Sequence, residues 1–409
     1  MLNLFFPEKA TVIVGLEIGT AKVAAVVGEV TDSGGVNVIG IGQCPSRGVR
    51  KGEVVNADAA AEDVRNAIVE AEKSADVEIA SVYLSVTGSH LTSLNTHGVF
   101  EAAADDHEIS PPDVNEVLAN AKVFNRPSEN TVLHAIRQHF TVNGQAGIAD
   151  PTGMFGRKLE LDMHVIHGVT TRLHHPMRVV KGLQLEVEEV VFSGLASSLA
   201  ILNNEQKQMG SLVVDFGAGT TEYVVYADGV IKHTGVIAVG GDHVTNDLSY
   251  GLRMAPARAA ALKKEHGAAT IEGAAGQTLT LTNENGFPDR RVNLEHLRRI
   301  MVARLDETLQ LIDEDIGEQG FHDQLRAGVC LCGGGARIRG IEKLAEDVFG
   351  LPATLGRADA VGGLRSATDD PEFATAVGLV KYGAMRQKAP HRGGLVGKLK
   401  HFAGSFGLF

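Results

Sequence analysis

The chain has little cysteine, no tryptophan and no long apolar run. Its 409 residues hold three cysteines, Cys44, Cys330 and Cys332, which are too few for a disulfide framework and indicate a reducing compartment. Cys330 and Cys332 share one side of a predicted strand, which favours small core residues over metal ligands. The start, MLNLFFPEKA, lacks the features of a signal peptide, and no run reaches membrane-spanning length. We therefore expect a cytoplasmic protein.

Positive charge is also scarce. The 38 lysines and arginines are outnumbered by 50 acidic residues, and the resulting net charge of −12 disfavours nucleic-acid binding. Any attraction to an anionic membrane must then come from a local basic segment. The hydrophobic content of 44% is that of an ordinary soluble protein. Because single cores usually stop growing at roughly 250 to 300 residues, the length predicts two or more domains.

The stretch LVVDFGAGTTEYVVY, residues 212–226, predicts a strand, a glycine turn and a second strand. Glycines at a turn let backbone N–H groups point at phosphate oxygens, and threonine hydroxyls add donors. The nearby carboxylates of Asp215 and Glu222 would orient Mg²⁺ through its water ligands. The predicted phosphate contacts are Gly217, Gly219, Thr220 and Thr221. An ordinary hairpin without a ligand is the alternative, because glycine-rich hairpins are common.

The same pattern occurs near the start of the chain. There, VGLEIGTAKVAAVV gives a strand that ends in Glu17, a turn and another strand. This repeat predicts two similar α/β domains whose hairpins face each other across a cleft. A nucleotide held between two domains can couple ligand state to domain closure. A third turn, Gly333 to Gly335, would let a nucleoside lie against bare backbone, unless it is only a βα turn that needs glycine.

Residues 89–157 differ in character from the hairpins. They contain a short predicted strand at 99–102, a helix from Ser110 to Val123 and further strands near Val132 and Val142, but no glycine-rich phosphate loop. We interpret this segment as an inserted subdomain for protein contacts. Histidines at positions 134, 139, 164 and 167 lack ligand spacing with matching cysteines or carboxylates, which favours surface or core positions over a metal site.

Three glycine turns in the order phosphate, phosphate, nucleoside resemble the actin-like ATPase superfamily. Within it, the chain resembles the FtsA family of bacterial cell-division proteins over nearly its whole length. The resemblance rests on VGLEIGTAKVAAVVGEV, IGQCPSRGVRKGEVVN, GLASSLAIL, GGDHVTNDLSYGL and PEFATAVGLVKYG. It implies an α/β, two-domain actin-like (ribonuclease-H-like) fold with a small subdomain inserted in domain 1 and a C-terminal amphipathic helix.

The resemblance also implies the domain boundaries. In chain order these are subdomain 1A at residues 1–88, the inserted subdomain 1C at 89–157, 1A again at 158–204, subdomain 2A at 205–242, subdomain 2B at 243–300, 2A again at 301–364, a return to 1A at 365–385, a linker at 386–394 and a membrane-targeting helix at 395–409.

ATP with Mg²⁺ is the ligand that the resemblance implies. The first phosphate loop falls on Gly19, Thr20, Ala21 and Lys22, the second on Gly217, Gly219, Thr220 and Thr221, and the nucleoside loop on Gly333, Gly334 and Gly335. Glu17 and Asp215 match the acidic positions near Mg²⁺, and with Glu222 they are the candidate catalytic residues.

Three departures from the family pattern bear on hydrolysis. The family usually has glycine where Ala218 stands, aspartate where Glu222 stands, and a glutamate near the ribose where this chain has Ala260. An extra methyl group in the turn, and a carboxylate moved out by ~1.5 Å, would misplace a water or metal enough to slow hydrolysis without abolishing binding. We therefore expect ATP binding with weak or absent hydrolysis.

The last fifteen residues, LVGKLKHFAGSFGLF, have helical spacing of apolar residues. One stripe contains Leu395, Leu399, Phe402, Phe406 and Phe409, and the basic Lys398 and Lys400 lie off it. A helix packed on the body is one interpretation, and an in-plane anchor on anionic lipid is the other. The linker and the basic charge favour the anchor. At half burial the stripe gains roughly 5 kcal/mol before the cost of ordering the helix, so one tail binds weakly and several on a polymer bind firmly.

The resemblance implies partners as well. The C-terminal tail of FtsZ would bind the subdomain that holds Arg290, Arg298, Arg299 and Arg304. Basic side chains suit an acidic peptide, although a solvated helix face is the alternative. The resemblance further implies a polymer of the chain itself, later division proteins at the inserted subdomain, and a peripheral location on the cytoplasmic face of the inner membrane at the division site.

Two other functions fit the same superfold. A sugar or acid kinase needs a positioned base for the acceptor hydroxyl, and the sequence offers no clear candidate beyond the acids near Mg²⁺. A pilus-assembly adaptor of the PilM kind shares the body and the insertion but usually lacks the amphipathic tail. The tail therefore favours a filament tether.

Overall fold

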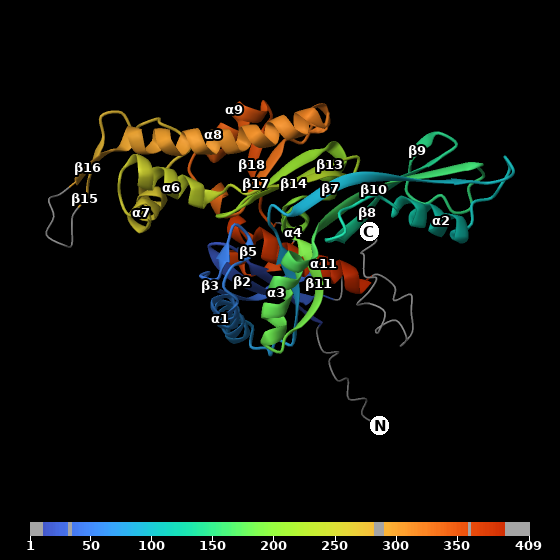
Figure 1. Ribbon diagram of the computed structural model, residues 1–409, viewed down its shortest axis with the longest axis horizontal. Helices are drawn as coiled ribbons and strands as arrows, with labels where there is room; N and C mark the ends of the chain where they lie inside the picture. Colours follow the sequence, from blue (N-terminus) through green and yellow to red (C-terminus); the bar gives the residue numbers. More distant parts are fainter. Residues whose placement is uncertain (1–10, 32–34, 282–289, 359–360, 389–409) are drawn as a thin grey trace, which may run out of the picture.

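The computed structural model describes residues 11–31, 35–281, 290–358 and 361–388. Two α/β domains are stacked on each other, and an inserted unit extends from one side of them (Figure 1). The predicted amphipathic helix at 395–409 lies outside the described residues, as does most of the linker before it. In the described ranges, none of the helices has the length and apolar character needed to cross a membrane.

A six-stranded sheet forms the first domain. Its strands, in spatial order, are β11 Glu186–Phe192, β6 Ser81–Val86, β1 Val12–Ile18, β2 Lys22–Val30, β3 Val36–Pro45 and β19 Gly362–Gly363. β1 pairs antiparallel with β2 and parallel with β6. Strand β2 is buried from Val23 to Gly28 because helices cover both faces of the sheet, which explains its unbroken apolar run.

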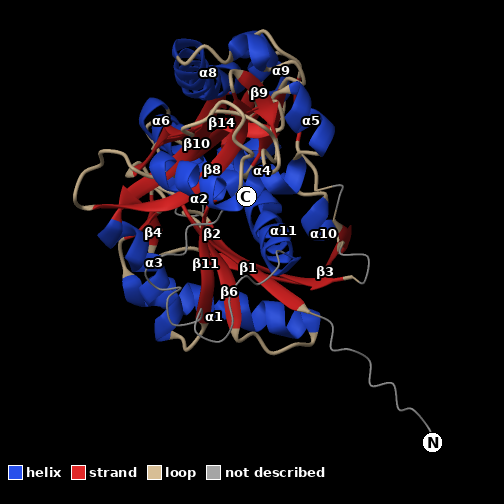
Figure 2. Cartoon of the chain, turned by 90° about the vertical axis from the view of Figure 1, so that its right-hand side faces the viewer, coloured by secondary structure: helices blue, strands red, loops and turns tan. Residues whose placement is uncertain are grey.

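Helix α1, Ala57–Ala75, covers one of these faces (Figure 2). Asn56 begins the helix, since its side-chain oxygen accepts a hydrogen bond from the backbone N of Ala59 at 3.1 Å. The apolar side chains that α1 buries recur along one helix face and are Ala60, Val64, Ala67, Ile68 and Ala71. Burying Val64 and Ile68 stabilises the domain by roughly 1.5 to 3 kcal/mol each. Helix α3, Thr170–Gly182, packs beside α1.

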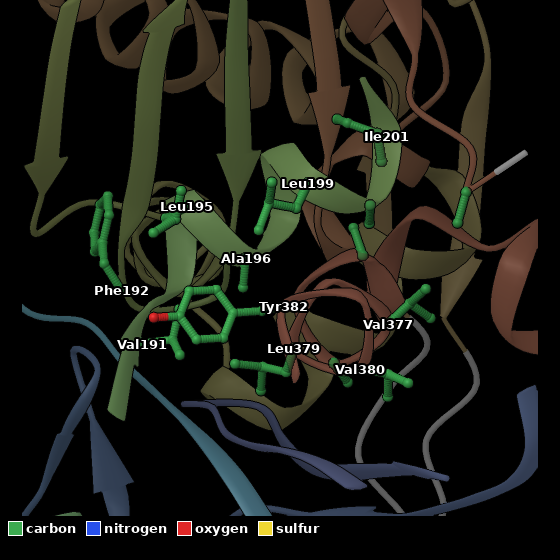
Figure 3. Close-up of a cluster of buried hydrophobic side chains, with 14 of the residues drawn as sticks. Val191, Phe192, Leu195, Ala196, Leu199, Ile201, Val377, Leu379, Val380 and Tyr382 are labelled. Atoms are coloured by element: carbon green, nitrogen blue, oxygen red, sulfur yellow. The ribbon is translucent and has the colours of Figure 1, made fainter. Parts of the chain in front are cut away.

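On the other face, helix α11, Ala374–Lys388, packs against α4, Ser193–Ile201 (Figure 3). The helices approach closely at Gly378, where a Cβ would lie 1.7 Å from the carbonyl oxygen of Ala196. Tyr382 on α11 is buried, and its hydroxyl donates to Oε1 of Glu189 on β11 at 2.6 Å. The chain enters the second domain after α4 and returns from it before α11. The packing of α4 on α11 therefore holds together the two segments that connect the domains.

The second domain repeats this plan with five strands. In spatial order they are β14 Val230–Ile237, β13 Thr221–Ala227, β12 Ser211–Phe216, β17 Val329–Cys332 and β18 Ala353–Leu355. Strands β12 to β14 form an antiparallel meander like β1 to β3, and β17 and β18 add in parallel. Helix α5, Asn204–Met209, precedes the meander, and α9, Ile341–Phe349, follows β17. Helix α10, Arg365–Thr368, follows β19 and packs on the first domain. The repeat predicted from the two hairpins is present in the fold.

A side subdomain lies at one end of the second domain. It consists of α6 Gly241–Gly251, α7 Pro256–His266 and the hairpin of β15 Thr278–Leu281 with β16 Arg290–Asn293. Helix α8, Leu294–Glu318, runs from this subdomain across the whole second domain (Figure 1). The predicted boundary at residue 300 falls inside this single helix and is wrong, because one buried stripe from Leu297 to Ile316 spans both units.

The inserted unit is a four-stranded antiparallel sheet that carries one helix. Its strands, in spatial order, are β7 Leu91–Glu101, β10 Lys158–Val169, β8 Asn130–Val142 and β9 Gln145–Ile148, and α2, Pro111–Ala121, packs on β7 and β10. Two predictions are wrong here. The short strand predicted at 99–102 is part of the longer β7, which ends at Glu101, and the boundary at 157 excludes β10, one of the two inner strands of this sheet.

Candidate functional site

The first predicted phosphate hairpin joins β1 to β2. The backbone N of Gly19 donates to the carbonyl of Lys22 at 2.9 Å and closes the turn. The hydroxyl oxygen of Thr20 accepts a hydrogen bond from the backbone N of Gly52 at 2.9 Å. The Nζ of Lys22 donates to the backbone carbonyl of Glu372. Residues from distant parts of the chain therefore hold this turn in place.

The second hairpin, between β12 and β13, closes in the same way. The backbone N of Gly217 donates to the carbonyl of Thr220 at 3.0 Å. The carbonyls of Gly217 and Ala218 accept from the backbone N of Gly241 and Asp242 at 3.0 and 2.8 Å. Gly241 and Asp242 open helix α6, so the turn satisfies backbone N–H groups that a helix start leaves without helical partners.

The three glycine turns meet at the interface of the two domains. A Cβ at Gly219 would lie 2.4 Å from the hydroxyl oxygen of Thr20, so the two hairpins are in contact. Gly333, in the third turn, has a φ of +80°, and a Cβ there would lie 2.4 Å from Oδ1 of Asp215. Glycine alone fits that position. At Gly334, in contrast, a Cβ would meet no atom of the described chain within 4 Å.

These turns line one cavity with a volume of ≈ 780 Å³. The lining includes Glu17, Asp215 and Glu222, and every predicted ligand-binding residue of the three turns except Thr221. Thr221 is buried in the sheet, where its hydroxyl donates to the carbonyl of Val239 at 2.8 Å. The predicted residues come from both domains, and all of them except Thr221 line this one cavity.

Three acidic side chains lie in the wall of this cavity. Asp215 and Glu222 are direct neighbours across β12 and β13. Burial raises the pKa of Glu17 to about 7, and burial together with the charge of Asp215 raises the pKa of Glu222 to about 8. Burial also raises the pKa of Asp215, whose Oδ2 accepts a hydrogen bond from the hydroxyl of Thr375 at 2.9 Å. In the absence of a cation, this group of acids therefore retains protons near neutral pH.

A divalent cation fits this set of groups. Oε2 of Glu17 is buried without a hydrogen-bond partner, and such an oxygen is costly unless a proton or a cation compensates it. Within the described ranges, no three histidine, cysteine, aspartate or glutamate side chains, these acids included, are arranged so that they could hold a metal ion by themselves. A Mg²⁺ ion here would therefore take its other ligands from phosphate oxygens and water, as Mg²⁺ usually does in nucleotide sites.

The wall of the cavity also contains residues that were not among the predicted site residues, and two of them make hydrogen bonds to the phosphate hairpin or to the helix beside it. Thr87, immediately after β6, donates its hydroxyl proton to Oε1 of Glu222 in the other domain. Lys263, on α7, lies near Ala260 in the lining, and its Nζ donates to the carbonyl of Gly241 at 2.6 Å. Thr87 directly follows the apolar strand β6, but its contact with Glu222 depends on how the two domains meet and has no local signal in the sequence.

The arginines predicted to bind a partner have different surroundings. Arg298 donates to two backbone carbonyls, and Arg304 forms an ion pair with Asp247 at 2.6 Å, so both side chains brace the subdomain itself. Arg299 lies on the outer side of α8, with 63% of its side chain exposed. Arg290 belongs to β16, and its side chain is outside the described part of the structure. Arg299 is therefore the most accessible of the three whose side chains are described.

Sequence comparison relates the chain to bacterial cell-division proteins. The family described as "Cell division protein FtsA" matches residues 212–378, and the family described as "SHS2 domain inserted in FTSA" matches residues 88–167. Cell division protein FtsA of Pseudomonas aeruginosa is 36% identical over 381 residues, which cover 93% of this chain and 91% of the relative. The second match includes most of β10, in agreement with its place in the inserted sheet.

Solved structures have the same fold at lower identity. A PilM–PilN type IV pilus biogenesis complex matches with a TM-score of 0.64 and 18% identity, covering 91% of this chain and 98% of the other. MreB5 of Spiroplasma citri bound to ADP matches with a TM-score of 0.58 and 16% identity, covering 95% and 100%. The prediction of a two-domain actin-like fold with a small inserted subdomain is confirmed.

Proposed function

Because the chain belongs to the FtsA family of cell-division proteins, we propose that it binds ATP with Mg²⁺ between its domains and tethers FtsZ filaments to the membrane at the division site. The observation that carries nucleotide binding is the convergence of three glycine turns and three acidic side chains on one cavity. The MreB5 structure, which shares the fold, contains ADP. Family membership favours this function over a pilus adaptor or a kinase of the same superfold.

In this proposal both hairpins hold phosphate groups and the third turn holds the nucleoside. Bound Mg²⁺ would supply positive charge that neutralises the phosphates and the buried acids. Glu222 is neutral below a pH of about 8 when no cation is present, and Thr87 holds its carboxyl group. Weak hydrolysis is expected from the departures at Ala218, Glu222 and Ala260, which would misplace the attacking water or the metal.

The tethering part of the proposal rests on the family and on the sequence of residues 395–409. The apolar stripe from Leu395 to Phe409 with Lys398 and Lys400 would lie in the surface of an anionic membrane on the cytoplasmic side. The FtsZ tail would bind the side subdomain at α8, where Arg299 is exposed. Polymerisation of the chain would multiply weak single anchors, and the inserted unit would contact later division proteins.

Gly334→Leu tests nucleotide binding directly. Gly334 lines the cavity, and a Cβ there would meet no other atom of the described chain within 4 Å, so the variant should fold and take space from the nucleoside. Gly317→Leu is the matched control, because that glycine on α8 also has open space around it and lies far from the cavity. We expect Gly334→Leu to weaken the binding of a fluorescent ATP analogue with Mg²⁺ at least about 100-fold, since the ligand loses its space. Equal affinity in both variants would refute the assignment.

A further inference from the structure

The inserted unit follows the first domain in the chain but is fastened to the second. The hydroxyl of Ser93 donates to the carbonyl of Thr234 at 2.7 Å, and the amide of Gln138 donates to the carbonyl of Ile231 at 2.7 Å. His164 has its Nε2 3.0 Å from the hydroxyl oxygen of Thr234. Three strands of the insertion thus bind β14, the edge strand of the five-stranded sheet.

Two of these three bonds are buried, and the bond from Ser93 is partly buried. His164 is fully buried, and Gln138 and Thr234 are nearly so. Breaking one of them leaves a buried polar group without a partner, which costs more than the bond itself contributes. Asn95 adds a further bond, from its amide to the carbonyl of Lys232 at 2.9 Å. The fastening to β14 is a built interface rather than an incidental contact.

The insertion also makes a buried side-chain hydrogen bond to the first domain. This bond lies closer to the point of insertion than the bond from Gln138 to β14 does. Nε2 of His134 accepts a hydrogen bond from the backbone N of Phe192 at 3.0 Å. His134 pairs in the sheet with Ile166, two residues from Gly168, where the chain leaves the insertion. Gln138 lies farther out along the same strand. The contact with the first domain is thus near the pivot, and the contacts with β14 extend outward from it.

The root of the insertion forms part of the wall of the cavity. Thr87 and His90 line it, and Thr87 donates to Glu222 on the phosphate hairpin of the second domain. Between them, Gly88 has a φ of +132°, a conformation that glycine adopts readily and other residues rarely do. Gly168, on the outgoing strand, packs so closely on the ring of His90 that a Cβ would lie 2.8 Å from its Nδ1. Both chain crossings at the root therefore contain a glycine.

From this arrangement, and resting on the proposed nucleotide function, we propose that the inserted unit is a lever that pivots at Gly88 and Gly168 and moves with the second domain. Its short arm, at His90, lies in the wall of the cavity, and its long arm carries α2 and β9 away from the body (Figure 1). Closure of the cleft on ATP turns the long arm relative to the first domain. By linkage, a partner that turns the long arm changes the affinity for ATP equally.

Distances between spin labels test which domain the insertion follows. Labels at Val123 in the insertion, Val69 in the first domain and Leu311 in the second occupy exposed positions. Cys44→Ser removes the partly exposed native thiol, and Cys330 and Cys332 are buried. With Mg²⁺ and ATP, we expect the 123–69 distance to change and the 123–311 distance to stay constant. A change in 123–311 with a constant 123–69 distance would overturn the proposal.

A second comparison tests the fastening without depending on nucleotide. Ser93→Ala with Gln138→Met removes two bonds to β14, and Asp105→Asn, at an exposed site on the far end of the insertion, is the control. We expect the double variant to broaden the 123–311 distance distribution in the nucleotide-free protein and to change the Kd of ATP by about 2- to 30-fold. The control should do neither. An unchanged 123–311 distance distribution would refute the lever. Absence of ATP binding in the parent would refute the proposed function, and the 123–311 distribution of the nucleotide-free protein would still decide the lever.

Discussion

Glu222 should make the stability of the nucleotide-free protein depend on pH. Its side chain is 3% exposed, and burial raises its pKa from an ordinary value of 4.5 to about 8. Between these two pH values the unfolded chain has released a proton that the folded protein still binds. The free energy of unfolding therefore falls as the pH rises, by about 1.4 kcal/mol per unit for one proton. The stability is complete below pH 4.5 and is lost as the pH rises through 8.

The variant Glu222→Gln has the shape of the protonated acid and cannot lose the proton. Between pH 6 and pH 8 the parent should lose about 2 kcal/mol of unfolding free energy relative to this variant, slightly less than two full units because titration begins below the pKa. Glu17, whose pKa is raised to about 7, titrates in both proteins. Because its charge also raises the pKa of Glu222, the difference between the two proteins includes this interaction. The two proteins should differ least in stability at the acidic end of the range, because the parent side chain at 222 keeps its proton in the unfolded chain as well only below pH 4.5.

Urea unfolding at pH 5 to 9, with a chelator and without nucleotide, measures this difference. Glu78→Gln is the control, because Glu78 is an exposed acid in the loop before β6. The control should follow the parent at every pH. If the Glu222→Gln and parent curves remain parallel from pH 6 to 8, Glu222 is ionised in the folded protein without a cation, and the argument that burial holds its proton is wrong.

Three further outcomes are expected. Arg299→Glu should weaken the binding of an acidic FtsZ-tail peptide, measured by fluorescence anisotropy, by about 3- to 10-fold as an exposed charge pair becomes a repulsion, while Lys343→Glu on the exposed side of α9 should not; equal affinities would remove α8 from the binding site. Deletion of residues 395–409 should abolish co-sedimentation with anionic vesicles, and a truncated protein that still pellets with them would disprove the anchor. Glu222→Asp should release phosphate from ATP faster than the parent, and brisk turnover by the parent would contradict slow hydrolysis.

The glycine turns were predictable because their chemistry is local. Gly19 and Gly217 each donate to a carbonyl three residues later, so a short window of sequence specifies each turn. The pairing of β10 was not predictable in this way. Alternating apolar residues at 158–169 predict a strand, and the pattern does not say which sheet the strand joins. The boundary at residue 157 is wrong for this reason.

Contacts between residues far apart in the sequence account for the other features of the site that the sequence did not predict. Thr87 and Glu222 are separated by 135 residues, and Ser93 and Thr234 by 141. In both pairs, the sequence around one residue contains nothing that identifies the other. Arg304 was predicted as a partner-binding charge because α8 carries many arginines, but Asp247, 57 residues earlier, neutralises it. Charge on a helix predicts exposure only where no other element of the fold supplies a counter-ion.

The structure also clarifies how the two departures in the second hairpin act. Ala218 is not among the residues with a positive φ, so its methyl group does not strain the turn, and its carbonyl remains bonded to Asp242. Its effect must therefore come from the space that the methyl group occupies. Glu222 has the extra length that carries its carboxyl group to Thr87 of the other domain. An aspartate is one CH₂ shorter and would not span that interface in the same position. The residue expected only to slow hydrolysis is thus also the side chain through which the phosphate hairpin contacts the root of the insertion.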